Sequence, residues 1–208
     1  MKLDILYRLQ HTINMSAYIT GEHNLTFLHI PKTAGTSILD WLRTNKGDSN
    51  IVEWETHPKH SELPEGNISF AIVRNPWDRM VSAYHYLKNI SLPEGSSWLA
   101  LNNISQDNFP SFDEWINNLE YYKNPDVYWF RPETQQMEWL DRPVDIILRF
   151  ENLAKEFSRI QQHYGCFDPL PVLYATKHKS YKNYYTEKTK LIVEKFSQRD
   201  IDTFKYSF

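Results

Sequence analysis

The sequence contains a single cysteine, Cys166, and lacks any long run of apolar residues. One cysteine excludes a disulfide framework and a cysteine-based metal site within one chain, and it is typical of a reducing compartment. No segment approaches the roughly 18 consecutive apolar residues of a membrane-spanning helix, and the start Met1–Leu6 lacks the apolar stretch of a signal peptide. We therefore expect a soluble, cytoplasmic chain without a membrane segment, with Cys166 in the core or in a buried loop.

The sequence also has little net charge, −3 over 208 residues, which argues against a general nucleic-acid binder. The charge is uneven, because residues 177–208 hold eight Lys or Arg against four Asp or Glu. A basic C-terminal segment on an acidic body suits one wall of an anion-binding site. A solvated helix face would give the same composition, so both interpretations stay open.

Apolar residues make up 41% of the chain and are arranged as strands that alternate with helices. The predicted strands are 26–30, 51–54, 68–73 and 144–150. The predicted helices are 38–45, 76–87, 112–119, 132–140, 153–163 and one that begins near 187. This alternation predicts an α/β, P-loop-like three-layer fold, in which helices flank both faces of a mostly parallel central sheet.

The length of the chain predicts one domain over residues 1–208, because it suits a single globular core. Residues 1–24 form an N-terminal extension in this prediction. Residues 89–110 are rich in Ser, Asn, Pro and Gly, which indicates an irregular loop long enough to be functional.

One segment, His29–Ser37 with the sequence HIPKTAGTS, joins a predicted strand to a predicted helix. Successive backbone N–H groups and a helix N-terminus favour an anion there. Gly35 would let the backbone approach the anion closely, and Lys32 adds a mobile cation. Hydroxyl donors come from Thr33, Thr36 and Ser37. The segment therefore predicts a phosphate-binding loop, with an ordinary strand-to-helix turn as the alternative.

The loop does not follow the Walker pattern, since its lysine precedes its glycine. A P-loop kinase also needs an acidic residue at the end of a buried strand to hold Mg²⁺. Arg74 follows one such strand, and Arg149 with Phe150 ends another, before Glu151, which is a poor substitute. The pattern indicates an anionic donor that needs no metal.

A second motif, VRNPWDRMVSAY, spans Val73–Tyr84. Arg74 leaves a strand tip with a planar guanidinium suited to phosphate, while Asn75 and Pro76 begin a helix. Ser82 follows about two turns later, where its hydroxyl could reach the same anion. Arg79 also fits the motif, and both a role in binding the anion and a structural role stay open for it.

These two motifs resemble those of the sulfotransferases that use 3′-phosphoadenosine 5′-phosphosulfate (PAPS), in the form found in carbohydrate sulfotransferases. The resemblance implies that the first loop holds the 5′-phosphosulfate and that Arg74 and Ser82 hold the 3′-phosphate. It covers about residues 25–208, except for 89–110, which would face the acceptor. In the first loop, the resemblance implies that the 5′-phosphosulfate is bound by Lys32, Thr33, Gly35, Thr36 and Ser37.

A late basic segment, Lys177–Tyr185, resembles the loop that closes over the nucleotide in this family. The residues it offers for the 3′-phosphate or the adenosine are Lys179, Ser180 and Lys182. A plain surface loop is the alternative for each of them.

Transfer to a hydroxyl needs a general base near the acceptor, beside Lys32, which would stabilise charge on the leaving phosphate. Related enzymes have functional histidines in the stretch that holds His57 and His60 here, so we favour His60 and then His57. Glu55 is a carboxylate alternative. No metal is expected, because Pro58 disfavours a helix that would bring the two histidines together. We expect a structural role for His29, in the strand before the loop, while His85 lies on the predicted helix after the second motif.

The segment 128–136 resembles an acceptor-side element of the family. Its candidates for binding the acceptor are Trp129, Arg131 and Gln135, although a core aromatic cluster would explain Trp129 equally well. The sequence thus predicts a PAPS-dependent O-sulfotransferase that acts on a carbohydrate or another small hydroxylated acceptor. A P-loop kinase or NTPase and a non-catalytic nucleotide-binding module remain as alternatives.

Overall fold

The computed structural model describes residues 16–20, 24–45, 50–54, 58–89, 102–105, 107–122, 134–173, 175 and 178–208. The chain forms two compact units. The first, called the sheet unit, comprises Met1–Arg74 and Gln136–Ala175. The second, called the helical unit, comprises Asn75–Gln135 and Thr176–Phe208. No described helix is long and apolar enough to cross a membrane.

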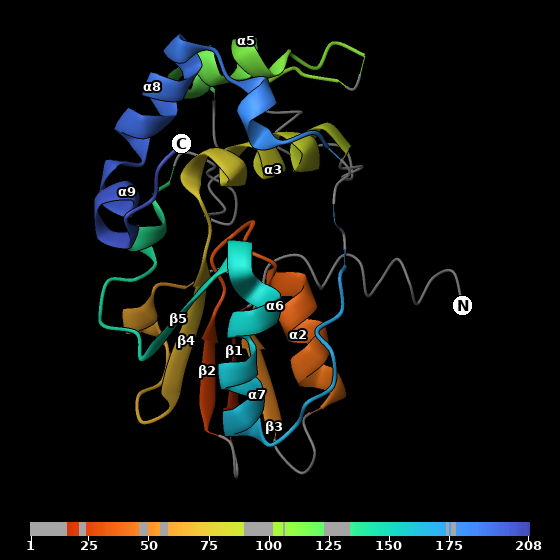
Figure 1. Cartoon of the computed structure of the whole chain (residues 1–208), viewed down its shortest axis with the longest axis vertical. Helices are drawn as coiled ribbons and strands as arrows, with labels where there is room; N and C mark the ends of the chain where they lie inside the picture. Colours follow the sequence, from red (N-terminus) through yellow and green to blue (C-terminus); the bar gives the residue numbers. More distant parts are fainter. Residues whose placement is uncertain are drawn as a thin grey trace. The chain divides into compact units, whose positions relative to one another are not determined.

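The sheet unit contains one five-stranded sheet with the order β3-β1-β2-β4-β5 (Figure 1). Its strands are β1 (Ser16–Thr20), β2 (Leu25–Leu28), β3 (Asn50–Trp54), β4 (Ile68–Val73) and β5 (Ile146–Arg149). Strand β4 is parallel to both β2 and β5, whereas β1 is antiparallel to both β2 and β3. Four strands therefore share one direction, which confirms the predicted α/β fold with a mostly parallel sheet.

Strand β1 was not predicted, because residues 1–24 were assigned to an N-terminal extension. It pairs through Ala17 with Phe27 of β2 and with Glu53 of β3. The side chain of Ala17 is fully buried. Its short segment carries too little periodic signal to be recognised as a strand without these neighbours.

The core of the sheet unit is formed where α2 (Gly35–Thr44), α6 (Leu153–Glu156) and α7 (Ser158–Tyr164) pack against the sheet (Figure 1). Phe27 of β2 and Phe70 of β4 stack with ring centroids 5.0 Å apart. Trp41 of α2 meets Phe157 edge-on at 5.0 Å, and its indole N–H donates to the carbonyl of Asp168 at 2.7 Å. Consecutive residues of β2 and of β4 after Ile68 are buried, which is typical of parallel sheets covered on both faces.

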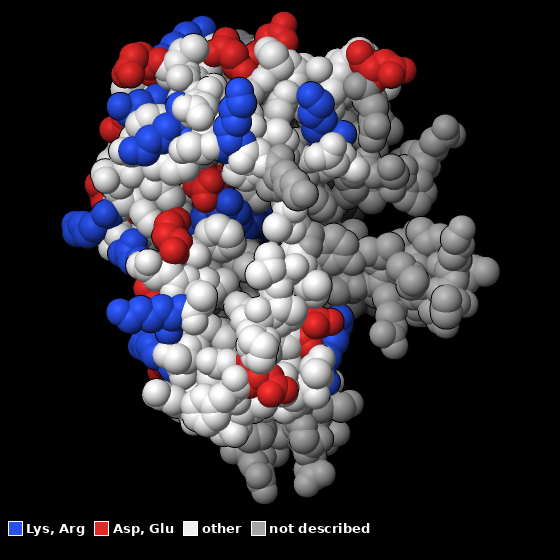
Figure 2. Space-filling view, turned by 45° about the vertical axis from the view of Figure 1, so that its right-hand side comes forward, with Lys and Arg blue, Asp and Glu red and all other residues white. Residues whose placement is uncertain are grey.

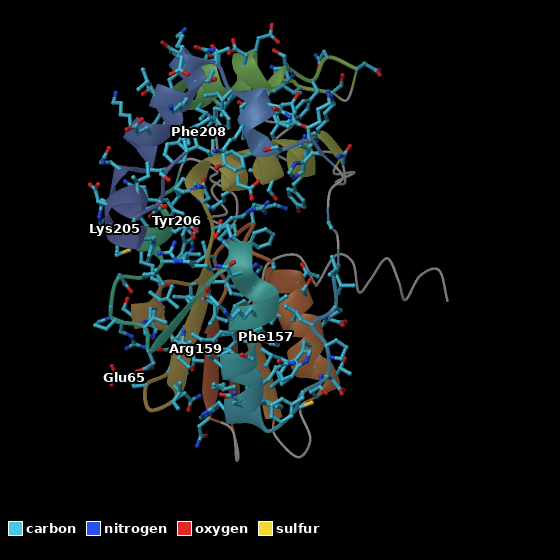
Figure 3. All side chains as sticks on the ribbon, in the orientation of Figure 1. Glu65, Phe157, Arg159, Lys205, Tyr206 and Phe208 are labelled. Carbon is cyan, nitrogen blue, oxygen red and sulfur yellow. The ribbon has the colours of Figure 1, made fainter. Side chains whose placement is uncertain are left out.

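Among its described residues, the sheet unit also has three short 3₁₀ turns: η1 (His60–Glu62), η3 (Gln136–Glu138) and η4 (Phe150–Asn152). The helix predicted at 132–140 is thus only the single turn η3 within the described residues. Side chains fasten the segment after η3 to the segment before β4. Arg142 pairs with Glu65 at 2.9 Å (Glu65 is labelled in Figure 3), and the backbone N–H of Ser61 donates to Asp141 at 2.9 Å.

The helical unit contains α3 (Pro76–Asn89), α5 (Phe112–Asn117), η2 (Leu119–Tyr121), η5 (Tyr181–Tyr184), α8 (Glu187–Phe196) and α9 (Gln198–Phe204). Helix α3 begins at Pro76 as predicted. Aromatic rings form much of the core of this unit, and Phe208 (labelled in Figure 3) lies 5.5 Å from both Trp77 and Tyr185, centroid to centroid.

The basic side chains of α8 share their surface with acidic ones. Lys190 Nζ lies 3.9 Å from Glu187 Oε2. On the face that Figure 2 shows, Lys and Arg are interspersed with Asp and Glu. This arrangement supports a solvated helix face for α8, while the segment before it, at 178–182, is considered below.

Candidate functional site

The segments with the strongest motifs follow the carboxyl ends of strands in the sheet unit. His29–Ala34 follow β2, Arg74 follows β4 and Phe150 follows β5. Because β2, β4 and β5 are parallel to one another, these three ends lie at the same edge of the sheet. This is the edge at which open α/β sheets bind their ligands.

The loop after β2 has an unusual backbone. Lys32 and Ala34 have φ values of 68° and 73°, in the left-handed region that residues other than glycine rarely adopt. Left-handed residues within a tight turn direct successive N–H groups to one side, which creates a concavity suited to an anion. Such strained conformations persist where the surroundings hold them, and they cluster at functional sites.

Thr33 holds this loop from within. Its side chain is fully buried, and its hydroxyl donates to the carbonyl of Ile30 at 2.8 Å. The hydroxyl hydrogen is therefore committed to the loop itself. In this structure the side chain of Thr33 therefore fixes the shape of the turn.

Helix α2 begins at the loop without a side-chain cap. Ala34 occupies the N-cap position, has no side-chain oxygen, and accepts the first helical hydrogen bond from Ile38 at 3.2 Å. The first turn contains no acidic residue. The first N–H groups of a helix have no intrahelical partner and carry partial positive charge, which favours an anion at this end.

Gly35 faces a neighbour that the sequence analysis did not associate with it. A Cβ atom at this position would overlap the imidazole ring of His29. His29 is buried, and its ring stacks on Phe27 at 5.6 Å between centroids. Gly35 thus lets His29 pack against the start of α2, and its φ does not require a glycine. His29 therefore has a structural role, as the sequence analysis expected.

The hydroxyl groups of the first turn differ in their surroundings. Ser37 is buried, 5% exposed, and its hydroxyl accepts from the N–H of Leu173 at 3.1 Å. That bond uses a lone pair of the oxygen and leaves the hydroxyl able to donate. Thr36 and Lys32 are half-buried at the surface of the loop.

Arg74 is held at its backbone by Gln136. Its N–H donates to Oε1 of Gln136 at 2.8 Å, and Nε2 of Gln136 donates back to its carbonyl at 2.8 Å. Gln136 is fully buried and lies in η3, 62 residues away in the sequence. The side-chain amide thus pairs with Arg74 as a neighbouring strand would, one residue beyond the end of β4.

The guanidinium of Arg74 is held separately. Its central carbon lies 3.9 Å from the ring centroid of Phe150, a cation–π contact. Its Nη1 donates to the carbonyl of Lys32 at 3.2 Å. Arg74 itself is 7% exposed. The structure thus brings together Arg74 and the loop after β2, two parts of the predicted site.

The remaining predicted residues of the nucleotide site belong to the helical unit. Ser82 is buried within α3, while Lys179, Ser180 and Lys182 are exposed. Arg79 is 4% exposed, and its Nη1 donates to the carbonyl of Thr134 at 2.8 Å, which favours the structural role for it.

The predicted acceptor residues are described only in part. Gln135 accepts the N–H of Arg199 at 2.9 Å through its side-chain oxygen, within the helical unit. Trp129 and Arg131 lie outside the described residues, as does His57.

His60 is described, and its contacts are with the segment after η3. Its N–H donates to the carbonyl of Trp139 at 2.9 Å, and its ring Nδ1 lies 3.2 Å from the carbonyl of Arg142. Since a carbonyl can only accept, Nδ1 carries the proton in this contact. Hydrogen bonds from Ser69, and to a lesser degree the charge of His60, hold the pKa of Asp145 below its usual value. These contacts place His60 beside residues 139–145 and do not connect it with the loop after β2.

The helical unit contains a histidine cluster that the sequence analysis missed. His85 of α3 and His178 stack with centroids 5.2 Å apart and planes 7° from parallel. His85 Nε2 lies 2.9 Å from the hydroxyl of Tyr184. Partial burial, then the neighbouring His178 and Lys88, lower the pKa of His85. The two histidines are 93 positions apart by their numbers, so no local pattern connects them.

Among the described residues, no group of three or more His, Cys, Asp or Glu side chains is arranged to hold a metal ion. Gln136 and Phe150 are the main residues of the site that the sequence analysis missed. The sequence analysis named Phe150 only as the end of a predicted strand. Nothing in the sequence around Gln136 indicates its contact with Arg74.

Comparison with known proteins gives one finding. The model of the Sulfotransferase family matches residues 15–207, and so extends through both units. No curated protein and no solved structure matches the chain.

The contact between Gly35 and His29 leads to a prediction about the folding stability of variants at these positions. Gly35→Ala forces a methyl group into the imidazole, and overpacking of this kind costs about 1–3 kcal/mol. In the double variant Gly35→Ala/His29→Ala the collision is absent, so we expect it to be no less stable than His29→Ala alone. Urea unfolding of the three variants measures this coupling. Losses that simply add would show that the two residues do not interact.

The histidine cluster makes a prediction about pH. Because folding lowers the pKa of His85, the unfolded chain binds more protons below about pH 6.5. The stability contributed by this site is therefore present above that pH and is lost as the pH falls. We expect the thermal midpoint to fall less steeply between about pH 7.5 and pH 5 in His85→Phe than in the wild type. His178→Phe, which removes the second cause of the shift, should give a smaller flattening. An unchanged slope in both variants would contradict this account.

Proposed function

The chain belongs to the sulfotransferase family, and on this premise we propose that it transfers a sulfuryl group from PAPS to a hydroxyl of a carbohydrate or another small hydroxylated acceptor. Family membership makes it a transferase of sulfuryl groups to a hydroxylated acceptor in general. The observation that carries the finer proposal is the loop His29–Ala34, with two left-handed residues before an uncapped helix and Arg74 bonded to its backbone.

The 5′-phosphosulfate of the donor is assigned to this loop and to the first turn of α2. Backbone N–H groups of residues 33–37 would bind the phosphosulfate oxygens, with Lys32 as the neutralising cation. The hydroxyls of Thr36 and Ser37 add donors. Gly35 contributes by leaving room for the imidazole of His29 beside the start of α2.

The 3′-phosphate is assigned to Arg74, whose planar guanidinium suits bidentate binding of phosphate. Ser82 of α3 is the second proposed ligand, on the family resemblance of its motif. Lys179, Ser180 and Lys182 are proposed for the adenosine or the 3′-phosphate. Lys182 is exposed, and its ammonium lies 5.6 Å from the ring centroid of Phe208.

Chemically, the proposed reaction forms a bond between the acceptor oxygen and sulfur and breaks the bond between sulfur and the 5′-phosphate oxygen. The leaving oxygen takes the bonding electrons, and the acceptor hydroxyl gives its proton to a base. Lys32 and the N–H groups of the loop would stabilise the charge that develops on the leaving phosphate. The left-handed turn and the buried Thr33 would hold the N–H groups of the loop in place before PAPS binds, so that little reorganisation is needed.

The base and the acceptor site stay predictions. His60 remains the first choice for the base and His57 the second, and Trp129, Arg131 and Gln135 remain the choices for the acceptor. If His60 is the base, its Nε2 is the atom that would accept the proton, because Nδ1 faces the carbonyl of Arg142.

Titration calorimetry with 3′-phosphoadenosine 5′-phosphate, the product of the donor, tests the proposal. Lys32→Ala and Arg74→Ala should each weaken binding about 10- to 100-fold, since each removes a charge-assisted hydrogen bond. Lys155→Ala on the exposed side of α6 is the matched control and should bind as the wild type does. Wild-type affinity in both Lys32→Ala and Arg74→Ala would overturn the site.

Assays on the wild-type protein distinguish the enzyme from the two alternatives, a binding module and a P-loop kinase. Transfer of sulfate from PAPS to any member of a panel of hydroxylated acceptors supports the enzyme. Tight nucleotide binding without transfer to any of them supports a binding module. Turnover of ATP that depends on Mg²⁺ would support a P-loop kinase instead.

A further inference from the structure

Arg74 is restrained by three residues that lie far apart in the sequence. Gln136 binds its backbone, Phe150 lies against its guanidinium, and the carbonyl of Lys32 accepts from Nη1. All four residues belong to the sheet unit. An arginine on a strand tip normally samples many rotamers, and fixing it costs side-chain entropy when a ligand binds. Here much of that cost is met by the fold.

The restraint at the backbone comes from a buried amide. Gln136 is fully buried and uses both ends of its side chain on the same residue, as donor to the carbonyl and acceptor from the N–H. A buried amide with both groups satisfied is rigid, because any rotation would leave polar groups without partners. The Cα of Arg74 is therefore fixed relative to the end of β4.

The restraint at the side chain comes from an aromatic face. The centroid of the Phe150 ring lies 3.9 Å from the guanidinium carbon, a cation–π contact in which the ring limits the movement of the guanidinium. A guanidinium held in one orientation presents its N–H groups as the fixed fork that binds a phosphate. The bond from Nη1 to Lys32 sets the rotation of the plane and links Arg74 to the left-handed residue of the loop.

We propose that Phe150 and Gln136 are positioning residues that make Arg74 selective for a nucleotide with a 3′-phosphate. This inference rests on the proposed function. Neither residue need touch the nucleotide, because both act through the orientation of Arg74. The consequence is selectivity between PAPS and the same donor without the 3′-phosphate, and not a general gain in affinity.

Two nucleotides separate this role from a structural one. Titrations use 3′-phosphoadenosine 5′-phosphate and adenosine 5′-phosphate, which differ only in the 3′-phosphate. We expect Phe150→Leu to weaken the first about 5- to 10-fold and the second less than about 2-fold, since the cation–π contact is lost while a large apolar side chain remains. Phe150→Tyr retains the aromatic face and should restore the preference. Gln136→Met should reduce the preference in the same way.

A double variant tests whether the effect passes through Arg74. In the Arg74→Ala background, Phe150→Leu should cause no further loss of either nucleotide. Equal weakening of both nucleotides by Phe150→Leu, or no weakening of either, would overturn the inference. So would losses that add to those of Arg74→Ala.

Failure of the inference differs from failure of the proposed function. If the wild type prefers the 3′-phosphorylated nucleotide and Arg74→Ala abolishes that preference, the proposed site stands whatever Phe150→Leu does. If the wild type binds the two nucleotides equally, the proposed 3′-phosphate site is wrong, and the inference is overturned with it.

Discussion

Parallel pairing of β2, β4 and β5 is the constraint on which the site depends. The register Leu28↔Ala71 and Val73↔Arg149 brings the three strand ends to one edge of the sheet. Lys32, Arg74 and Phe150 then follow their strands within a few residues and meet, although they are separated widely in the sequence. Antiparallel pairing would send consecutive strand ends to opposite edges, and no such convergence would occur.

Around this edge, local strain is balanced by burial. The two left-handed residues of the loop are unfavourable by themselves. They are held by the buried hydroxyl of Thr33, by the packing of His29 against Gly35, and by the bond from Arg74 to Lys32. A loop fixed by three separate contacts offers its N–H groups in one arrangement. That arrangement is what binding and stabilising an anion requires.

The sequence predicted the parts of this site that depend on local signals. The strand 68–73, the helix start at Pro76 and the strand-loop-helix around Lys32 agree with the structure. It did not predict strand β1, whose place is set by pairing with two other strands. It also missed Gln136, His178 and the contact of His29 with Gly35, because each depends on a partner brought close only by folding. Hydrophobic periodicity reports which face of an element is buried, and it carries no information about which distant side chain covers it.

A crystal structure with 3′-phosphoadenosine 5′-phosphate would show which groups of the protein bind each phosphate. We expect the 5′-phosphate within about 3 Å of N–H groups of residues 33–37 and the 3′-phosphate on the guanidinium of Arg74, at ordinary hydrogen-bond distances. Phe150 should keep its cation–π contact with that guanidinium. A 5′-phosphate bound away from the loop, or a 3′-phosphate that makes no contact with Arg74, would contradict the proposed site.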